Sequence, residues 1–167
     1  NTLVGAGLRE SIRVGASGKI VSAFDMARAL ALGADWCNSA RGFMFALGCI
    51  QAQTCHSGNC PTGVTTQDPT RQLALVVPSK AERVHNFHTH TLEALQELME
   101  ASGLQTPHDF TPRHIMRRVS ETQTLHLSEL VETVEANALL KEDVSELPAV
   151  FSDWPLTSAK SFAIQAH

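Results

Sequence analysis

The chain has 167 residues, of which 43% are hydrophobic, so it is long and apolar enough to bury a core, and we expect an ordered chain over most of its length. Its formal net charge of −4 gives no electrostatic reason to expect a nucleic-acid or polybasic membrane partner, and no apolar run reaches the roughly 18 residues of a membrane span. With four cysteines and no signal-peptide pattern, we expect a soluble, cytoplasmic protein.

The first elements predicted along the chain are a strand, a tight turn and a helix. Residues 12–16 have the composition of a short strand, and the glycine-containing turn 17–19 follows. Ser22 and Asp25 have the spacing of a capping box, which predicts a helix over residues 22–32. Because a second strand is expected next, this helix should be the crossover between two parallel strands.

That second strand, residues 35–40, leads into the most informative part of the sequence. The apolar run 43–50 predicts a buried helix that carries Cys49 towards the other clustered cysteines. Residues 55–77 are rich in Gly, Pro and Thr, which predicts an irregular loop. Loops of this length in a compact domain commonly have a function, such as surrounding a cofactor.

The longest predicted helix begins at Pro78 and stops at Gly103, with Ser79 and Glu82 as a second capping-box pair. Beyond it the sequence predicts only short helical pieces and a terminal tail. The pieces are expected at residues 112–119 and 127–134, and the extended tail covers about the last 25 residues.

Two glycine turns that follow the predicted strands form a candidate phosphate site. Backbone N–H groups at a glycine turn and at a helix start bind phosphate, and in (β/α)8 barrels this site follows the last two strands. Each turn also carries a cation. The candidate residues are Gly15, Ser17, Gly18 and Lys19 in the first turn, and Ala40, Arg41 and Gly42 in the second.

Cys49, Cys55 and Cys60 form the second candidate site, because three thiols within twelve residues of a Gly/Asn/Pro-rich loop are difficult to explain by packing. Their spacing and the Cys-Pro ending favour an iron–sulfur cluster, which needs no fourth protein ligand. Zinc is the alternative, with a fourth ligand taken from His56, His85, His88 or His90. A structural module that is not catalytic is therefore an alternative function. Cys37, which lies in the second predicted strand, is interpreted as a core residue.

Two observations suggest a piece of a longer protein. The chain begins at Asn1 rather than Met, and two strands are too few for a parallel sheet, which is normally covered on both faces. We expect the rest of the sheet to come from another part of the protein or from an oligomer partner.

Several segments together resemble the FMN-binding synthase domain of glutamate synthase, most closely the stand-alone FMN-binding glutamate synthase-like proteins. The resemblance covers about residues 5–105 and is most specific across the cysteine loop. The segments are Val-Gly-Ala-Ser-Gly-Lys at 14–19, residues 24–35, Ala-Arg-Gly-Phe-Met-Phe-Ala-Leu-Gly-Cys at 40–49, and 55–69 with its Cys-Pro-Thr-Gly.

The resemblance implies an α/β fold, in which residues 1–104 are the C-terminal strand-helix-strand portion of an FMN-type (β/α)8 TIM barrel with its cysteine loop. Residues 105–167 would be a mostly helical and extended C-terminal tail. The two strands would be the seventh and eighth of the barrel. Cys49, Cys55 and Cys60 would hold a 3Fe-4S cluster, and the two glycine turns would bind the FMN phosphate.

The implied reaction is the reductive amination of 2-oxoglutarate with ammonia to give glutamate. The electrons would come from ferredoxin or an NAD(P)H-linked reductase. An N-methylglutamate synthase-type relative, which uses an amine, is an alternative with the same cofactors. Because the catalytic and substrate-binding residues would lie upstream, we expect these 167 residues alone to be inactive and to bind FMN weakly or not at all.

Overall fold

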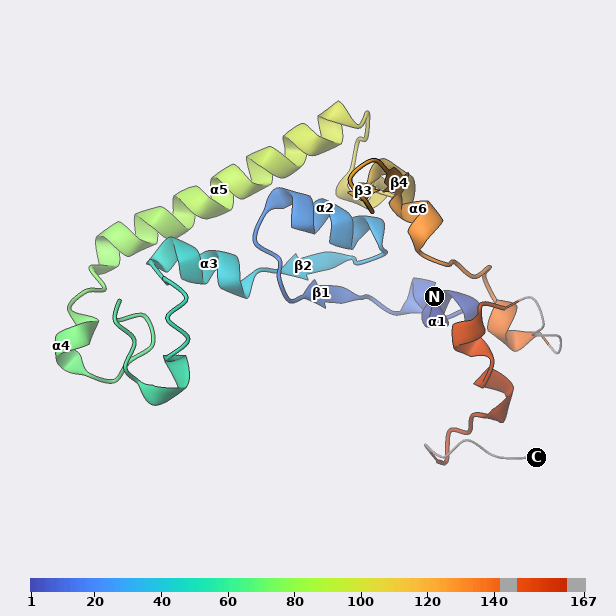
Figure 1. Ribbon diagram of the computed structural model, residues 1–167, viewed down its shortest axis with the longest axis horizontal. Helices are drawn as coiled ribbons and strands as arrows, with labels where there is room; N and C mark the ends of the chain where they lie inside the picture. Colours follow the sequence, from blue (N-terminus) through green and yellow to red (C-terminus); the bar gives the residue numbers. More distant parts are fainter. Residues whose placement is uncertain (142–146, 162–167) are drawn as a thin grey trace. The chain divides into compact units, whose positions relative to one another are not determined.

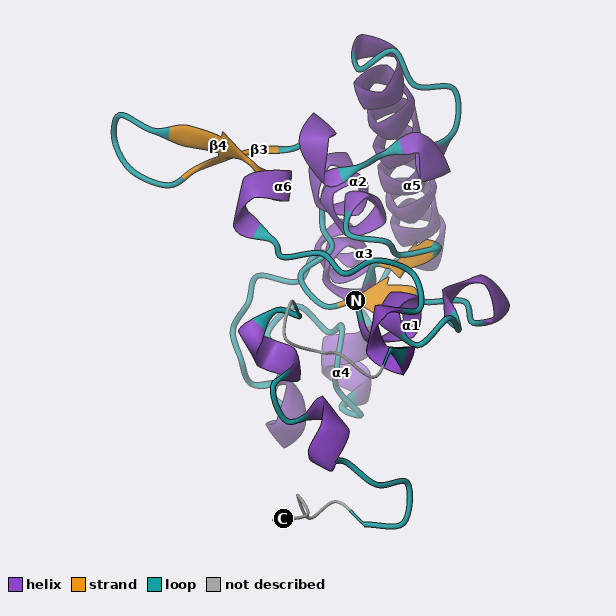
Figure 2. Cartoon of the chain, turned by 90° about the vertical axis from the view of Figure 1, so that its right-hand side faces the viewer, coloured by secondary structure: helices purple, strands orange, loops and turns teal. Residues whose placement is uncertain are grey.

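The computed structural model describes residues 1–141 and 147–161. The chain forms two compact units (Figure 1). The larger unit is Val14–Ile115, and the smaller unit combines Asn1–Arg13 with Met116–His167. Helices and strands both occur, so the fold is of mixed α and β type (Figure 2). The predicted domain boundary between residues 104 and 105 stays a prediction.

The larger unit contains the predicted strand–helix–strand arrangement and the long helix. Its elements, with η for a 3₁₀ turn, are β1 (Gly15–Ser17), α2 (Ala23–Ala31), β2 (Trp36–Asn38), α3 (Ala40–Leu47), η2 (Cys55–Ser57), α4 (Pro69–Gln72), α5 (Val77–Ala101), η3 (Pro107–Asp109) and η4 (Pro112–His114).

The two strands β1 and β2 pair in parallel, with Ala16 opposite Cys37, as the sequence predicts. Both strands are shorter than predicted. Asp35 reinforces the pair from outside β2, because its backbone N–H donates to the Val14 carbonyl (2.7 Å) and its carboxylate accepts from the Val14 N–H (2.6 Å). These hydrogen bonds hold together the two strands that the crossover helix connects.

The predicted capping box at the start of α2 is confirmed. The Asp25 N–H donates to the Ser22 hydroxyl (3.3 Å), and the Ser22 N–H donates to the Asp25 carboxylate (3.0 Å). These bonds stabilise the ionised carboxylate, and the backbone bond from Ser22 contributes most to lowering the pKa of Asp25. Buried side chains follow one face of α2, namely Ala23, Ala27, Leu30 and Ala31.

Helix α3 differs from the predicted helix over residues 43–50. It begins three residues earlier, at Ala40, and stops at Gly48, whose left-handed backbone (φ 105°) ends the helix. Its apolar side chains are half-buried rather than buried. Helix α5 packs against both α2 and α3 (Figure 1), and the Phe43 and Phe87 rings meet edge to face at 5.2 Å.

The predicted capping box at Ser79 is wrong. Helix α5 starts at Val77, with Val76 as its N-cap, and no side chain caps it. Pro78 fits inside the first turn, where its missing N–H has no helical partner to lose, so Ser79 already lies within the helix. The predicted stop at Gly103 agrees with the last helical residue, Ala101, and with the left-handed backbone of Gly103.

The residues that follow the long helix, most of them in the smaller unit, correct three predictions. Residues 112–119 are not a helix, because only the turn η4 is helical and 116–118 form a strand that pairs with β4. Helix α6 ends at Leu130 rather than 134. The tail contains two 3₁₀ turns, although residues 142–146 and 162–167 of that prediction lie outside the described part. The described elements of the smaller unit are α1 (Thr2–Gly5), η1 (Arg9–Ser11), β3 (Met116–Arg118), β4 (Thr124–His126), α6 (Leu127–Leu130), η5 (Ala138–Leu140), η6 (Ala149–Phe151) and η7 (Trp154–Leu156).

Contacts between η5 and α1 hold the smaller unit together. A Cβ atom on Gly5 would lie 2.6 Å from the Leu139 side chain, so only glycine allows this approach. The Asn137 N–H donates to the Val4 carbonyl (3.1 Å), and the Trp154 indole donates to the Leu139 carbonyl (3.0 Å).

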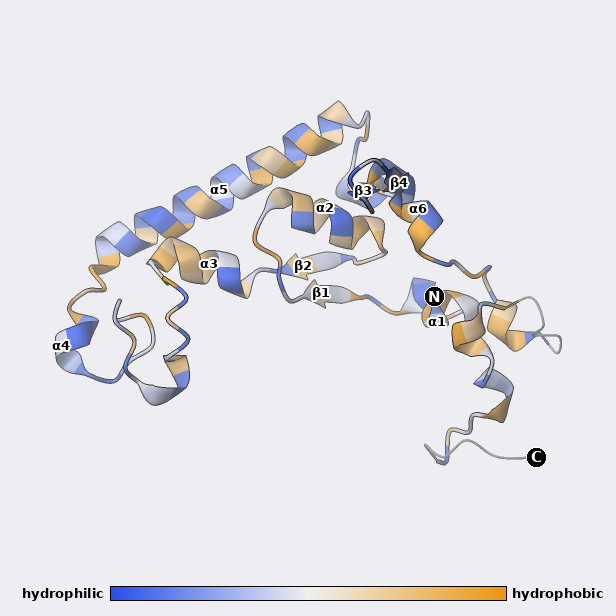
Figure 3. Ribbon diagram, viewed as in Figure 1, coloured by the Kyte–Doolittle hydropathy of each residue, from blue (hydrophilic) through white to orange (hydrophobic). Residues whose placement is uncertain are grey.

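Several large apolar side chains of the larger unit lie at its surface. Phe24 and Leu32 of the crossover are each 51% exposed, and Trp36 is 47% exposed. Figure 3 shows apolar and polar residues alternating along α5. None of the helices in the described part of the chain is both long and apolar enough to cross a membrane.

Candidate cofactor site

The two predicted phosphate turns lie at the same edge of the parallel strand pair. Ser17 pairs with Asn38, so the turn after β1 and the start of α3 both follow the carboxyl ends of these strands. The Ser39 hydroxyl links them directly by donating to the Ile20 carbonyl (2.8 Å). Ligands of open parallel sheets bind at this kind of edge.

The first turn has the backbone geometry of a ligand cradle. Gly18 and Lys19 both have positive φ values, 96° and 57°. A Cβ atom on Gly18 would meet nothing within 4 Å, so its backbone is open to a bound group. Gly15 has a packing role, because a Cβ atom there would lie 2.5 Å from the Trp36 indole. Ser17 and Lys19 are exposed.

The second turn is the first turn of α3. Ser39 is the N-cap, but its hydroxyl is bonded to Ile20 and no side chain caps the helix. Ala40 and Arg41 are exposed there, whereas Gly42 is buried against α5. The N–H groups at the start of this eight-residue helix are therefore free of side-chain caps, which suits an anion.

The three clustered cysteines line one small pocket of the larger unit. Cys49 follows the end of α3, Cys55 begins η2, and Cys60 lies in the loop beyond. Cys55 is exposed and Cys49 is half-buried, whereas Cys60 is only 8% exposed. The predicted irregular loop 55–77 is interrupted by η2 and α4.

Threonines around Cys60 favour its ionised form. The Thr62 hydroxyl lies 3.4 Å from the Cys60 sulfur, and this hydrogen bond, followed by that of the Thr65 N–H, lowers the pKa of Cys60 to about 6. The Thr65 hydroxyl also favours the thiolate, although it is buried without a partner in good hydrogen-bond geometry. Because a thiolate is the form that binds metal, Cys60 is prepared to act as a ligand at neutral pH.

Arg71 fixes the loop around Cys60. Its guanidinium donates to the carbonyls of Asn59 (3.2 Å) and Cys60 (3.5 Å), and it pairs with Asp68 at 3.4 Å. Asp68 also caps α4 by accepting from the Thr70 N–H (2.8 Å). The position of Cys60 therefore depends on Arg71 of the short helix α4, eleven residues further along the chain.

The geometry bears on the choice between zinc and a cluster. Within residues 1–141 and 147–161, no three His, Cys, Asp or Glu side chains converge closely enough to hold one metal ion. A zinc ion needs four ligands around one point, whereas in an iron–sulfur cluster the cysteines bind different irons and need not converge on one point. His88, one of the alternative zinc ligands, stacks on Phe43 at 6.1 Å.

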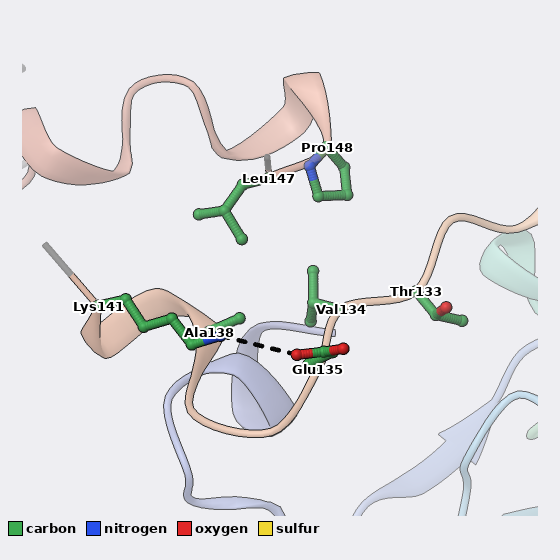
Figure 4. Close-up of a pocket in the computed structure, with 7 residues that line it drawn as sticks. All are labelled: Thr133, Val134, Glu135, Ala138, Lys141, Leu147 and Pro148. Carbon is green, nitrogen blue, oxygen red and sulfur yellow. Dashed lines mark ion pairs between the residues drawn. The ribbon is translucent and has the colours of Figure 1, made fainter. Parts of the chain in front are cut away.

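Cys37 has the opposite environment and lies apart from the cysteine pocket. It is half-buried in β2, and burial raises its pKa. It lines a mainly apolar cavity of about 440 Å³ together with Phe43 and Phe87. Cys37 is therefore only partly buried and is not one of the buried core side chains of the described residues. A further pocket, in the smaller unit (Figure 4), contains the Glu135–Lys141 ion pair (3.6 Å), and the described residues that line it include no cysteine or histidine.

Sequence reasoning missed four residues of this region: Ser39, Thr62, Thr65 and Arg71. Each acts through a hydrogen bond to a residue in an irregular segment, and no pattern of sequence spacing predicts such bonds. The one available signal was the group of threonines directly after the Cys-Pro pair.

The family model and the relatives that match this chain indicate the same protein family. A family model described as the conserved region in glutamate synthase matches residues 1–105. The chain is 42% identical over 125 residues to the glutamate synthase large subunit-like protein YerD of Bacillus subtilis, which covers 75% of this chain and 24% of that protein.

Two longer relatives match less closely. Identity is 34% over 120 residues with the NADH glutamate synthase of Schizosaccharomyces pombe, covering 72% of this chain and 6% of that protein. It is 29% over 148 residues with ferredoxin-dependent glutamate synthase 1, chloroplastic/mitochondrial, of Arabidopsis thaliana, covering 86% and 9%. The chain thus spans about a quarter of the first relative and less than a tenth of the other two. The chain belongs to the glutamate synthase family.

Proposed function

We propose that this chain is part of an FMN- and iron–sulfur-dependent oxidoreductase that forms glutamate by reductive amination of 2-oxoglutarate. The observation that carries the proposal is the placement of Cys49, Cys55 and Cys60 around one pocket, with Cys60 held towards the thiolate. Family membership supports the same reading.

The edge of the strand pair would hold the FMN phosphate. The open backbone at Gly18 and the uncapped start of α3 supply N–H donors, and the side chains of Lys19 and Arg41 add positive charge. Ser17 and Ala40 lie beside these donors. Gly15 and Gly42 contribute by allowing the close packing of Trp36 and Phe87.

The cysteine pocket would hold a 3Fe-4S cluster through Cys49, Cys55 and Cys60. When bound, the cluster and the flavin supply electron transfer, which the side chains of this chain cannot supply themselves. Helix α3 fixes the spacing between the two sites. Its eight residues span about 12 Å at 1.5 Å per residue, so the phosphate edge and Cys49 are joined by one short, rigid element.

The strands β1 and β2 would be the seventh and eighth strands of a (β/α)8 barrel completed by the rest of the protein. Exposed Trp36 and Phe24 support this, because parallel strands are normally covered on both faces. The pockets for 2-oxoglutarate and ammonia would lie elsewhere in the protein. The electron donor would be ferredoxin or an NAD(P)H-linked reductase, the two kinds of donor that the relatives' names contain.

The test is to purify the full-length protein under anaerobic and aerobic conditions and to quantify flavin, iron and sulfide. We expect about one FMN, three irons and four sulfides per chain, and glutamate formation from 2-oxoglutarate and ammonia with a reduced donor. The isolated 167 residues should bind FMN weakly or not at all. Neither flavin nor iron under both conditions would contradict the proposal, and one zinc without sulfide would indicate a structural module.

A further inference from the structure

Two cations of α5 lie over the residue that precedes the first cysteine of the loop. A Cβ atom placed on Gly48 would lie 3.1 Å from the Lys80 Nζ and 3.8 Å from an Arg83 Nη. Gly48 is bonded directly to Cys49, so both positive groups lie beside the residue that precedes the cysteine loop. Lys80 is half-buried there and Arg83 is exposed.

Among the described residues, no carboxylate forms an ion pair of 4 Å or less with either of these two charges. Residues 38–83 hold four Lys or Arg side chains against two acidic ones, Glu82 and Asp68, and Asp68 is paired with Arg71. The surroundings of the cysteine loop are therefore locally positive in a chain whose net charge is −4.

The position of Lys80 on its helix makes this charge more unusual. It lies four residues into α5, which has no side-chain cap and no acidic residue in its first turn. The start of a helix carries partial positive charge, so a cation there is unfavourable unless an anion lies close by. Three thiolates and a bound iron–sulfur cluster would be such an anion.

We propose that the positive charges of Lys80 and Arg83 raise the reduction potential of the cluster held by Cys49, Cys55 and Cys60. The inference rests on the proposed function above. Reduction transfers one electron from a one-electron donor, such as a reduced iron–sulfur protein, and makes the cluster and its thiolates more negative by one charge. Nearby cations stabilise that added charge, and net charge is one of the factors that set cluster potentials.

The experiment is a redox titration of the cluster in the full-length protein, with dithionite as the reductant and the EPR signal as the readout. We expect Lys80→Gln and Arg83→Gln each to shift the midpoint to more negative values. The double variant should favour the oxidised form about tenfold more than the unsubstituted protein, which is about 59 mV for one electron. Lys80→Arg keeps the charge and should restore most of the shift.

Glu82→Gln is the matched control, because it removes a charge from the same turn of α5. Residue 82 is two positions from Lys80, so it points about 200° away around the helix and should leave the midpoint nearly unchanged. Equal iron and sulfide contents in all variants separate a charge effect from loss of the site. A cluster with the same midpoint in the double variant would overturn this inference alone, whereas a protein without iron and sulfide would overturn the proposed function with it.

Discussion

Two thiols of the larger unit, Cys37 and Cys60, have opposite environments although neither is fully exposed. Burial in β2 raises the pKa of Cys37, whereas hydrogen bonds from Thr62 and Thr65 lower the pKa of Cys60 to about 6. A buried thiol without donors stays neutral, and a thiol surrounded by hydroxyl and N–H donors ionises. Burial therefore favours the neutral thiol at Cys37, whereas the donors around Cys60 favour its thiolate.

The first prediction concerns the titration of Cys60 in the cluster-free protein. The thiolate absorbance near 240 nm, taken as the difference from Cys60→Ser, should reach half its maximum near pH 6. Thr62→Val removes the largest contribution and should move that midpoint upwards. A midpoint near the ordinary cysteine value of 9.0 in the unsubstituted protein would contradict this account.

The same shift predicts the sign of a pH effect on stability. The pKa of Cys60 is lower in the folded state than its ordinary value of 9.0, so the folded state binds the proton less tightly than the unfolded chain. The contribution of Cys60 to stability should be full above about pH 9 and should be lost as the pH falls through 6. Urea unfolding of cluster-free protein and of Cys60→Ser across this range measures the difference.

At the scale of elements, the structure distinguishes two serines that have the same spacing to an acidic residue. Ser22 caps α2 through its hydroxyl, whereas Ser79 lies inside α5. Ser22→Ala should lower the free energy of unfolding by about 0.5–2 kcal/mol. Ser79→Ala is the control and should change it by only a few tenths, since Ala is favoured within a helix. Equal losses in urea unfolding would show that α5 starts later than Val77.

The approach of α3 to α5 gives a second prediction at this scale. A Cβ atom on Gly42 would lie 2.6 Å from both the Phe87 ring and the Ser39 hydroxyl. Gly42→Ala should therefore cost about 1–3 kcal/mol of stability, although alanine is normally the better helix residue.

Phe87→Leu supplies the test of that mechanism. If the clash is with the aromatic ring, Gly42→Ala should cost less in the Phe87→Leu background than in the unsubstituted protein. Stabilisation by Gly42→Ala alone would contradict the close approach of the two helices.

The predictions that succeeded depend on short stretches of sequence. The capping box of α2 needs only Ser22 and Asp25, and the strand–helix–strand order follows from local patterns. The failures depend on partners elsewhere. Residues 116–118 become a strand because β4 pairs with them, and no local pattern in that segment marks the pairing.

The candidate site divides in the same way. The cysteines and glycine turns were identifiable because their residue types are distinctive. The role of Thr62 depends on how an irregular loop folds over Cys60, and that of Lys80 depends on where α5 passes Gly48. No periodic pattern in the sequence predicts either contact, so only the structure reveals them.

At the scale of the whole molecule, the larger unit leaves several large apolar side chains exposed beside its parallel strand pair. Phe24, Leu32 and Trp36 remain about half exposed around a parallel sheet that has two strands in the described part of the chain. Such residues are usually buried by further strands and helices. The family relatives are four or more times longer than the matched region, which agrees with a site completed by other parts of the protein.

The central claim, that the cysteine loop holds an iron–sulfur cluster, is tested most directly by iron and sulfide contents of four single variants of the full-length protein. Cys49→Ser, Cys55→Ser and Cys60→Ser should each lose most of the iron and sulfide measured in the unsubstituted protein after anaerobic purification. Cys37→Ser should keep both, because Cys37 lies in β2 and outside the pocket of the other three. Full retention of iron and sulfide in all four variants, or loss in Cys37→Ser alone, would contradict the account.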